Sequence, residues 1–307
     1  MKKYLSIVLS ALMLVLALTS CQSWAPQTAP YNTEPVKTEA ADPAELGFDT
    51  CAEEIASIPV GESETDAHYP PNDTDEYGPY NFWIAEEKLY AADLMGADRS
   101  LLVMDIPSGQ LSRLHSDIPY FSALYDMYRP FCVKEGLIIS NRCAFEAETG
   151  LMTELHPPIP LEKEYASLQV MYTIGDDVFL SYDISEKADS RMVCRFDRQK
   201  MEWSEPELLF NTPEGTAYYS GDFKGCDAEG NRYFTPHDPK AEKDGHIRRV
   251  IEKYGPDDRL LARLPLHWFE DDLYKTGESS IRVTEDGTVY IMAPFADALR
   301  FYKVNMG

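Results

Sequence analysis

The chain has 307 residues, of which 52 are acidic and 28 are Lys or Arg, so its formal net charge is −24 at pH 7. This charge excludes a protein that binds nucleic acid through a basic surface, because such a surface must meet phosphate with Lys and Arg. It also excludes attachment to anionic lipid through clustered basic side chains.

The chain begins with MKKYLSIVLSALMLVLALTSC. A positive start and an apolar run up to Leu18 follow the order of a secretory signal peptide, and the run of about 14 residues is too short to span a bilayer comfortably as a helix. The ending LTSC resembles the lipobox of bacterial lipoproteins, which implies cleavage before Cys21 and lipidation of that cysteine. We expect a signal peptide over residues 1–20 and a protein lipid-anchored in the bacterial cell envelope, on the periplasmic side or at the cell surface. An ordinary signal peptide with a chance cysteine is the alternative.

The segment that follows, residues 21–46, is rich in Pro, Thr, Ala and Glu. It lacks the apolar periodicity that a segment needs to bury a core, so we expect a disordered tether. Residues 47–307 are long enough for one large β domain with a sizeable core.

Within residues 47–307, short alternating apolar runs are separated by Gly, Asp, Asn and Pro, which predicts many short strands. The runs recur as a unit about five times, at a spacing of about 45–60 residues, and a four-stranded unit of this size is one blade of a β-propeller. The fold class predicted is therefore all-β, a propeller of five or six four-stranded blades. The copies cover residues 81–114, 131–155, 168–210, 224–264 and 280–304.

The fifth copy stops after its third strand, and its missing outer strand has a candidate near the start of the domain. Residues 54–60 (EIASIPV) read like residues 260–266 (LLARLPL), the outer strand of the fourth copy. We expect residues 53–60 to pair with the last copy, because such a strand closes the ring and removes an exposed sheet edge.

Parts of these copies resemble the NHL-type and related bacterial propeller repeats, which often have six blades. Residues 78–82 (GPYNF) are similar to the G-P-x-x-F pattern of those repeats, and residues 227–233 (DAEGNRY) and 285–290 (EDGTVY) resemble their D-x-D-G-N-x-Y turn. The resemblance covers about residues 53–305 and implies a propeller, with five or six blades left open.

Five cysteines follow Cys21 in the chain. Their number is odd and no C-x-x-C spacing occurs, so the pattern signals neither a zinc site nor a redox dithiol. We expect small buried hydrophobic residues, with one disulfide left open. The five are Cys51, Cys132, Cys143, Cys194 and Cys226.

No motif predicts a catalytic residue, a metal site or a cofactor. Residues 72–76 (NDTDE) alternate oxygen ligands but lack the Gly and the distal Glu of an EF-hand loop, and a solvated acidic loop is the better interpretation. The turns at residues 227–231 and 285–287 suit tight hairpins directly. Histidines at positions 237, 246 and 267 have no G-x-S-x-G partner motif and are expected at the surface.

The connectors from each outer strand to the next inner strand are rich in aromatic residues, and in a propeller they converge on one face around the channel mouth. Aromatic side chains with polar tips at such a mouth suit a sugar, a peptide or an amphipathic ligand, whereas packing between blades is the alternative role. The candidate ligand-binding residues are Tyr80, Tyr128, Arg129, Tyr219, His267 and Trp268.

These features together favour a membrane-anchored lipoprotein whose propeller acts as a non-catalytic binding module. The expected partners are the membrane, reached through the N-terminal lipid, and an unknown protein or small-molecule ligand, with no nucleic acid and no cofactor. The alternative is a metal-dependent propeller hydrolase or lactonase, which needs carboxylates and an Asn converging on one cation in the channel. A propeller fold alone does not decide between them.

Overall fold

The structure is a computed structural model, and it describes residues 43–63, 65–68, 81–93, 100–115, 130–147, 149, 151–156, 169–184, 187–211, 222–236, 249–266, 281–295 and 297–307. All of them belong to one structural unit, which runs from Asp42 to Gly307. The described part is built from β-strands and one short helix, α2 (Phe48–Cys51). No helix within these ranges has the length and apolar character needed to cross a membrane.

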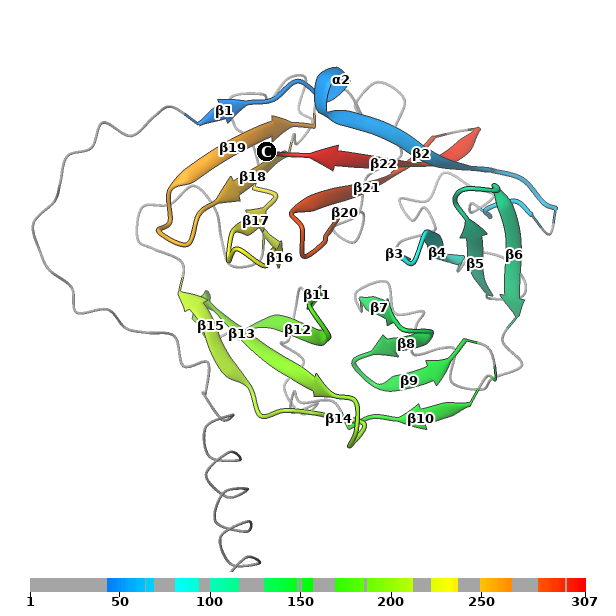
Figure 1. Cartoon of the computed structure of the whole chain (residues 1–307), viewed down its shortest axis with the longest axis horizontal. Helices are drawn as coiled ribbons and strands as arrows, with labels where there is room; N and C mark the ends of the chain where they lie inside the picture. The colour runs from blue at the N-terminus through cyan, green and yellow to red at the C-terminus, as the bar shows by residue number, and fades with distance from the viewer. Residues whose placement is uncertain are drawn as a thin grey trace, which may run out of the picture. The chain divides into compact units, whose positions relative to one another are not determined.

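Five sheets, antiparallel except for one short parallel pairing at the edge of the fourth, stand around a central axis as the blades of a propeller (Figure 1). Blade 1 contains β3 (Phe82–Ala85), β4 (Lys88–Asp93), β5 (Ser100–Asp105) and β6 (Gln110–His115). Blade 2 contains β7 (Phe131–Lys134), β8 (Leu137–Ser140), β9 (Cys143–Glu146) and β10 (Met152–Glu154). Blade 3 contains β11 (Val170–Ile174), β12 (Asp177–Ile184), β13 (Lys187–Asp197), β14 (Glu202–Trp203) and β15 (Glu207–Asn211).

The last two blades include strands from the start of the domain. Blade 4 contains β16 (Phe223–Cys226), β17 (Arg232–Phe234), β18 (Val250–Tyr254), β19 (Leu260–Pro265) and β1 (Ala44–Glu45). Blade 5 contains β20 (Ile281–Val283), β21 (Thr288–Pro294), β22 (Ala298–Asn305) and β2 (Ala52–Pro59). The sequence left five or six blades open, and the described residues form five.

The predicted closure of the ring is confirmed. Strand β2 pairs antiparallel with β22, in a register that runs from Ala52 opposite Val304 to Pro59 opposite Ala298. One pairing was not predicted: Ala44 and Glu45, which the sequence placed at the end of the tether, form β1 and pair in parallel with β19.

The hydrophobic core lies between neighbouring blades, because each sheet buries both of its faces. The closing interface between blades 5 and 1 is one example, in which Ile58 of β2 and Phe301 of β22 share a cluster with Phe82 of β3. The Phe82 and Phe301 rings meet edge to face with centroids 5.5 Å apart. Because each blade buries its apolar side chains against the next blade, every copy must supply apolar residues for the ring to close.

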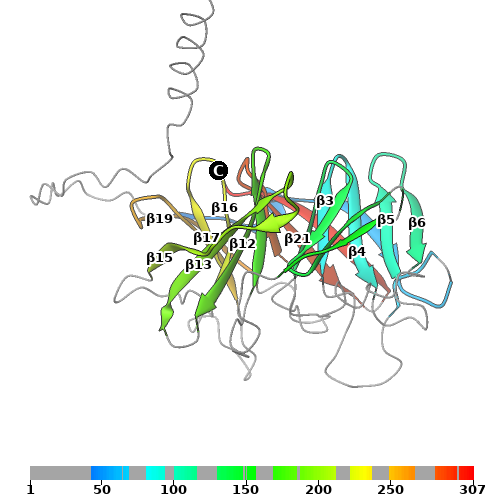
Figure 2. The same cartoon turned by 90° about the horizontal axis from the view of Figure 1, so that it is seen from below.

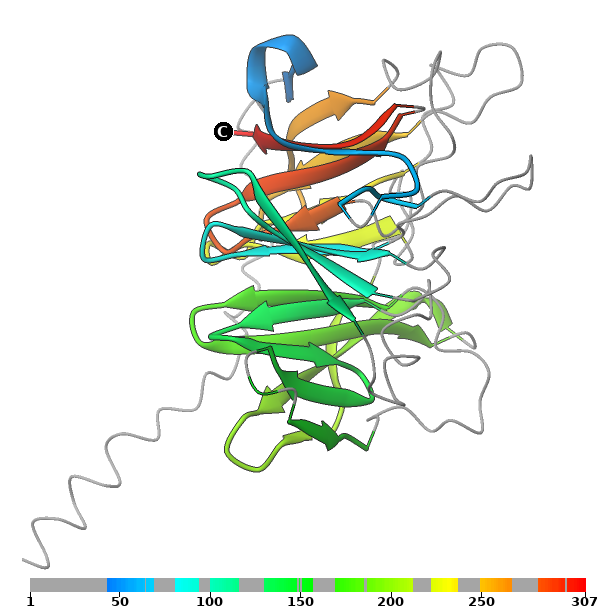
Figure 3. The same ribbon diagram turned by 90° about the vertical axis from the view of Figure 1, so that its right-hand side faces the viewer.

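The two ends of the ring are different. Turns between the first and second strands of all blades, such as residues 86–87 and 135–136, lie at one end, which we name the hairpin end; the C-terminus lies there too (Figures 2 and 3). The connectors between blades begin and end at the opposite end, which we name the connector end, because inner strands start there and outer strands finish there.

The hairpin turns of blades 4 and 5 are joined by a buried network. Asp227 accepts hydrogen bonds from the Asn231 backbone N–H (2.9 Å) and from the Tyr233 hydroxyl (2.9 Å), and that hydroxyl lies 3.3 Å from the carbonyl oxygen of Gly287 in the next blade. The pKa of Tyr233 is raised, mainly by burial and also by the nearby Asp227 carboxylate. The hydroxyl therefore stays protonated and remains a donor. These contacts confirm the hairpin interpretation of both turns and show that the turns also join two blades.

We expect Gly287→Ala to lower the free energy of unfolding by about 2–3 kcal/mol. Gly287 has φ +78°, where an added Cβ costs about 1–2 kcal/mol, and that Cβ would lie 2.8 Å from the buried Tyr233 hydroxyl, whose hydrogen bond contributes about 1 kcal/mol. The control is Gly109→Ala, because Gly109 has φ +68° and an added Cβ there meets no atom within 4 Å. Equal losses in urea denaturation would contradict the proposed clash.

The five cysteines of the propeller are free thiols, and all but the half-buried Cys51 are buried. Burial raises the pKa of Cys194 and of Cys226 to about 12, so both stay protonated at neutral pH. Their expected role as small buried hydrophobic residues is confirmed.

Candidate functional site

A cavity of about 340 Å³ lies at the hairpin end, among residues of four blades. It forms there because β3, β7 and β11, together with the turn after β20, stand around the same axis and end at the same level. Apolar and aromatic side chains line part of its wall, and acidic residues of the hairpin turns line another part. The side chains on which the following argument depends are Trp83, Ile84, Glu86, Lys134, Glu285 and Tyr290.

Hydrogen bonds hold the polar groups of this cavity in place. The Lys134 ammonium donates to the carbonyl oxygen of Gly175 (2.6 Å), and the backbone N–H of Gly175 donates to Glu285 Oε2 (2.5 Å), which links blades 2, 3 and 5. Asp286 accepts from the Thr284 hydroxyl (2.6 Å), and this bond first of all lowers the pKa of Asp286. The carboxylate is therefore ionised at neutral pH.

A second cavity, of about 540 Å³, adjoins the first over blade 2. Both linings include Glu86 and Glu135, and the second extends to Leu151, beside the outer strand of blade 2, and to Arg198 and Met201 of blade 3. Leu151 is 65% exposed, which is unusual for a large apolar side chain among the described residues. Together the two cavities form a groove from the channel mouth to the rim, which we name the hairpin-end groove.

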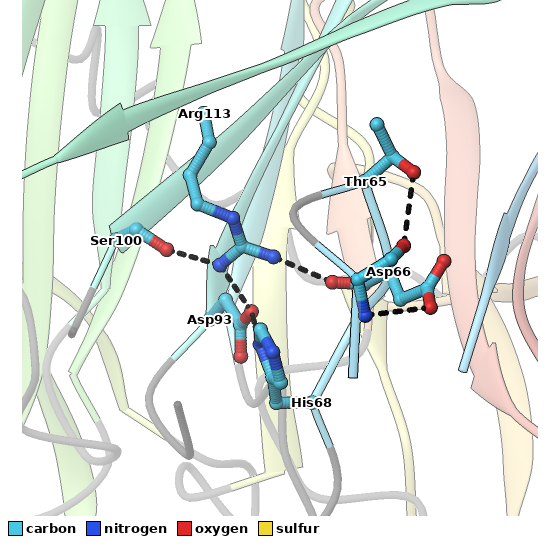
Figure 4. Close-up of polar contacts among 7 residues, drawn as sticks. Thr65, Asp66, His68, Asp93, Ser100 and Arg113 are labelled. Atoms are coloured by element: carbon cyan, nitrogen blue, oxygen red, sulfur yellow. Dashed lines mark hydrogen bonds and ion pairs between the residues drawn. The ribbon is translucent and has the colours of Figure 1, made fainter. Parts of the chain in front are cut away.

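At the connector end, a polar cluster pins the segment after β2 onto blade 1 (Figure 4). Asp93 Oδ2 accepts from Arg113 Nη1 (2.6 Å) and lies 2.6 Å from His68 Nδ1, and Arg113 also donates to Ser100 and to the carbonyl oxygen of Asp66 (2.5 Å). The Asp93 side chain is fully buried, and its second oxygen, Oδ1, has no hydrogen-bond partner within the described ranges. The cluster fixes the path of the chain from the closing blade to the first blade.

All of the residues that the sequence singled out as a site lie outside the described residues. These are the lipidation residue Cys21 and the ligand-binding candidates Tyr80, Tyr128, Arg129, Tyr219, His267 and Trp268. The described strands that flank the connectors with the aromatic candidates place both ends of each connector at one end of the ring. Their role in binding stays a prediction.

Sequence reasoning missed the hairpin-end groove, although a signal was present. The inner turns of the first, second and fifth copies carry acidic residues at matching places: Glu86 and Glu87, Glu135, and Glu285 and Asp286. Acidic residues in a turn usually face water, so the pattern by itself does not indicate a site. Only the ring geometry brings the three turns to one cavity.

Metal-ligating residues do not gather in the described part of the chain: no group of three or more His, Cys, Asp or Glu side chains there has an arrangement that could hold a metal ion. Four of the five carboxylates of the groove instead make hydrogen bonds or ion pairs with their neighbours, as Glu135 does with Arg198 and Glu146 does with Thr149. We propose no metal centre from these residues.

Comparison with known proteins assigns no family to this chain. No protein-family model matches it, and no curated protein matches it. Among solved structures, a calcium-binding protein, regucalcin, from Agrobacterium tumefaciens matches with a TM-score of 0.41 and 10% sequence identity, over 86% of this chain and 95% of that chain. At this distance the similarity assigns neither ligand nor activity to the present protein.

Proposed function

We propose that the chain is a lipid-anchored protein of the bacterial cell envelope whose propeller binds a ligand without converting it. The observation that carries the binding role is the cavity of about 340 Å³ at the hairpin end of the channel, where three inner strands and the first hairpin of blade 5 supply the wall. Ligand sites are typically concave, mostly pre-formed, and lined by apolar side chains with a few fixed polar groups. This cavity is concave, and five apolar or aromatic side chains, including Trp83 and Tyr290, share its lining with seven polar or charged ones.

The anchor half of the proposal rests on the sequence around Cys21. Each buried CH₂ of an acyl chain contributes about 0.8 kcal/mol, so two or three chains on Cys21 hold a protein stably at a membrane. The propeller would then face the solution on a tether that ends at β1.

We expect the wild-type protein to enter the detergent phase in a detergent-partition experiment and Cys21→Ala to remain in the aqueous phase. The reason is that the variant loses the acylated thiol while its propeller is unchanged. Both proteins are expressed with their signal peptides and detected by immunoblot. If wild type and Cys21→Ala partition in the same way, the proposal that Cys21 carries a lipid anchor is wrong.

The binding half is tested by filling the cavity. Ala85 lies in its wall, so Ala85→Phe should abolish capture of the ligand from native envelope by the purified protein. Ser112→Phe is the matched control, because it adds the same ring at an exposed position on the outer strand of blade 1. Melting temperatures confirm that both variants are folded. Equal capture by wild type and Ala85→Phe would show that the ligand site lies elsewhere.

A further inference from the structure

The hairpin-end groove carries more negative than positive charge. Its two cavities are lined by five carboxylates against the two cations Lys134 and Arg198, which gives a net charge of −3. Both cations have partners already, since Lys134 donates to Gly175 and Arg198 pairs with Glu135. The groove therefore favours a positively charged occupant. The carboxylates are Glu86, Glu135, Glu146, Glu285 and Asp286.

Glu86 occupies the junction of the two cavities and has no hydrogen-bond or ion-pair partner among the described residues. It lies with Glu87 in a two-residue turn in which both have left-handed backbone, with φ of +52° and +60°. Such positions favour Gly, Asn and Asp, so two glutamates there make the turn less stable than it could be. Of the two, only Glu86 lines the groove. This difference makes the pair a natural test of what the Glu86 carboxylate does.

Apolar side chains form another part of the wall, beside threonines, and offer contact to a hydrocarbon chain. Trp83, Ile84 and Tyr290 line the channel-mouth part of the groove, and Leu137, Leu151 and Met201 line the part over blade 2. Aromatic rings beside carboxylates hold organic cations through the negative face of the ring as well as through charge. A ligand with ammonium groups joined by methylene segments would match both kinds of wall.

Resting on the proposed binding function, we propose that the hairpin-end groove binds a small aliphatic polyamine. One ammonium group would lie at the channel mouth near Glu285 and Asp286, and a second near Glu86 and Glu135, with the methylene chain along the apolar side chains. The polyamine is held by charge and by hydrocarbon contact, and no bond is made or broken.

The test is isothermal titration calorimetry of the mature lipoprotein in non-ionic detergent with hexamethylenediamine. Hexanediol is the neutral control, because it has the same chain without the charges. We expect the diamine to bind and the diol not to bind, and we expect affinity to fall as salt is raised. Glu86→Asn should weaken binding about two- to fivefold, the contribution of one exposed carboxylate.

Glu87→Asn is the matched control for Glu86→Asn. Both changes put a better residue in a left-handed turn position, so both should raise the melting temperature by a similar amount, about 2–4 °C. Only Glu86→Asn should weaken diamine binding. The same affinity for both variants, or equal binding of diol and diamine, would overturn the assignment.

These experiments also distinguish failure of the polyamine proposal from failure of the proposed binding function. If the diamine does not bind, or if a lysine-rich peptide binds in its place, while Ala85→Phe still abolishes capture from native envelope, the binding function stands and the polyamine is wrong. If Ala85→Phe has no effect on capture either, the proposed function fails as well.

Discussion

Removal of the closing strand is expected to destabilise the whole propeller, whereas removal of the tether is not. Deletion of residues 22–42 stops before β1 and should leave the melting temperature nearly unchanged. Deletion of residues 22–62 removes β1, α2 and β2, exposes the edge of β22, and takes the fully buried Ile58 out of the cluster between blades 5 and 1. Burying one such side chain contributes about 1.5–3 kcal/mol, and each ladder hydrogen bond contributes about 1 kcal/mol.

The expected loss for the longer deletion is therefore about 5 kcal/mol or more, which corresponds to about 10–20 °C in a domain of this size. Differential scanning calorimetry measures both deletions. Should the longer deletion fail to fold, Ile58→Ala replaces it, with an expected loss of about 2–5 kcal/mol. Ser57→Ala on the exposed side of the same strand is its control and should change stability by no more than about 0.5 kcal/mol. Equal melting of the two deletions would contradict ring closure by β2.

Loss of the Arg191 side chain is expected to cost about 3–5 kcal/mol of stability. Arg191 lies fully buried on β13, donates to Asp183 Oδ1 (3.0 Å) and to the carbonyl oxygen of Ser181 (3.2 Å), and packs over the Phe223 ring of blade 4. Burial lowers the pKa of Arg191, and the charge of Asp183 opposes that effect. Arg191→Met would leave the buried Asp183 carboxylate without this cation.

Two further variants show whether the buried charge is the cause. Arg195→Met removes the same side chain from the same strand at a position that is 62% exposed, and should cost no more than about 0.5–1 kcal/mol. Adding Asp183→Leu to Arg191→Met should recover much of the loss, because two apolar side chains then replace a buried carboxylate that has lost the Arg191 cation. Urea denaturation of the three variants gives these values. A double variant as unstable as Arg191→Met would assign the loss to packing against Phe223 instead.

The blades were predictable from the sequence because each one is a local pattern. Alternating apolar runs and turn residues mark the strands of each copy, and the likeness of residues 54–60 to residues 260–266 identifies the closing strand. Both conclusions depend on side chains that repeat. The pairing of β1 was not predictable, because a strand of only two residues, Ala44 and Glu45, is too short to leave such a pattern.

The buried charges and the groove were not predictable, because they depend on which blades become neighbours. Arg282 on the inner strand β20 is an example: its guanidinium donates to the backbone carbonyl oxygens of Phe82 (3.0 Å) and Ile281 (2.7 Å) and to the side chain of Asn81. Burial lowers its pKa to about 10, so it stays charged at neutral pH. In the sequence, the same arginine reads as a solvated residue of a short strand.

An experimental structure of the protein purified from its native source, with the captured ligand bound, is the most direct test of the proposed function. We expect the ligand, chemically unchanged, in the cavity at the hairpin end, in contact with Glu86, Glu285 or Tyr290. A ligand bound at the connector end would contradict this placement, and a ligand found converted to product would contradict a purely binding role.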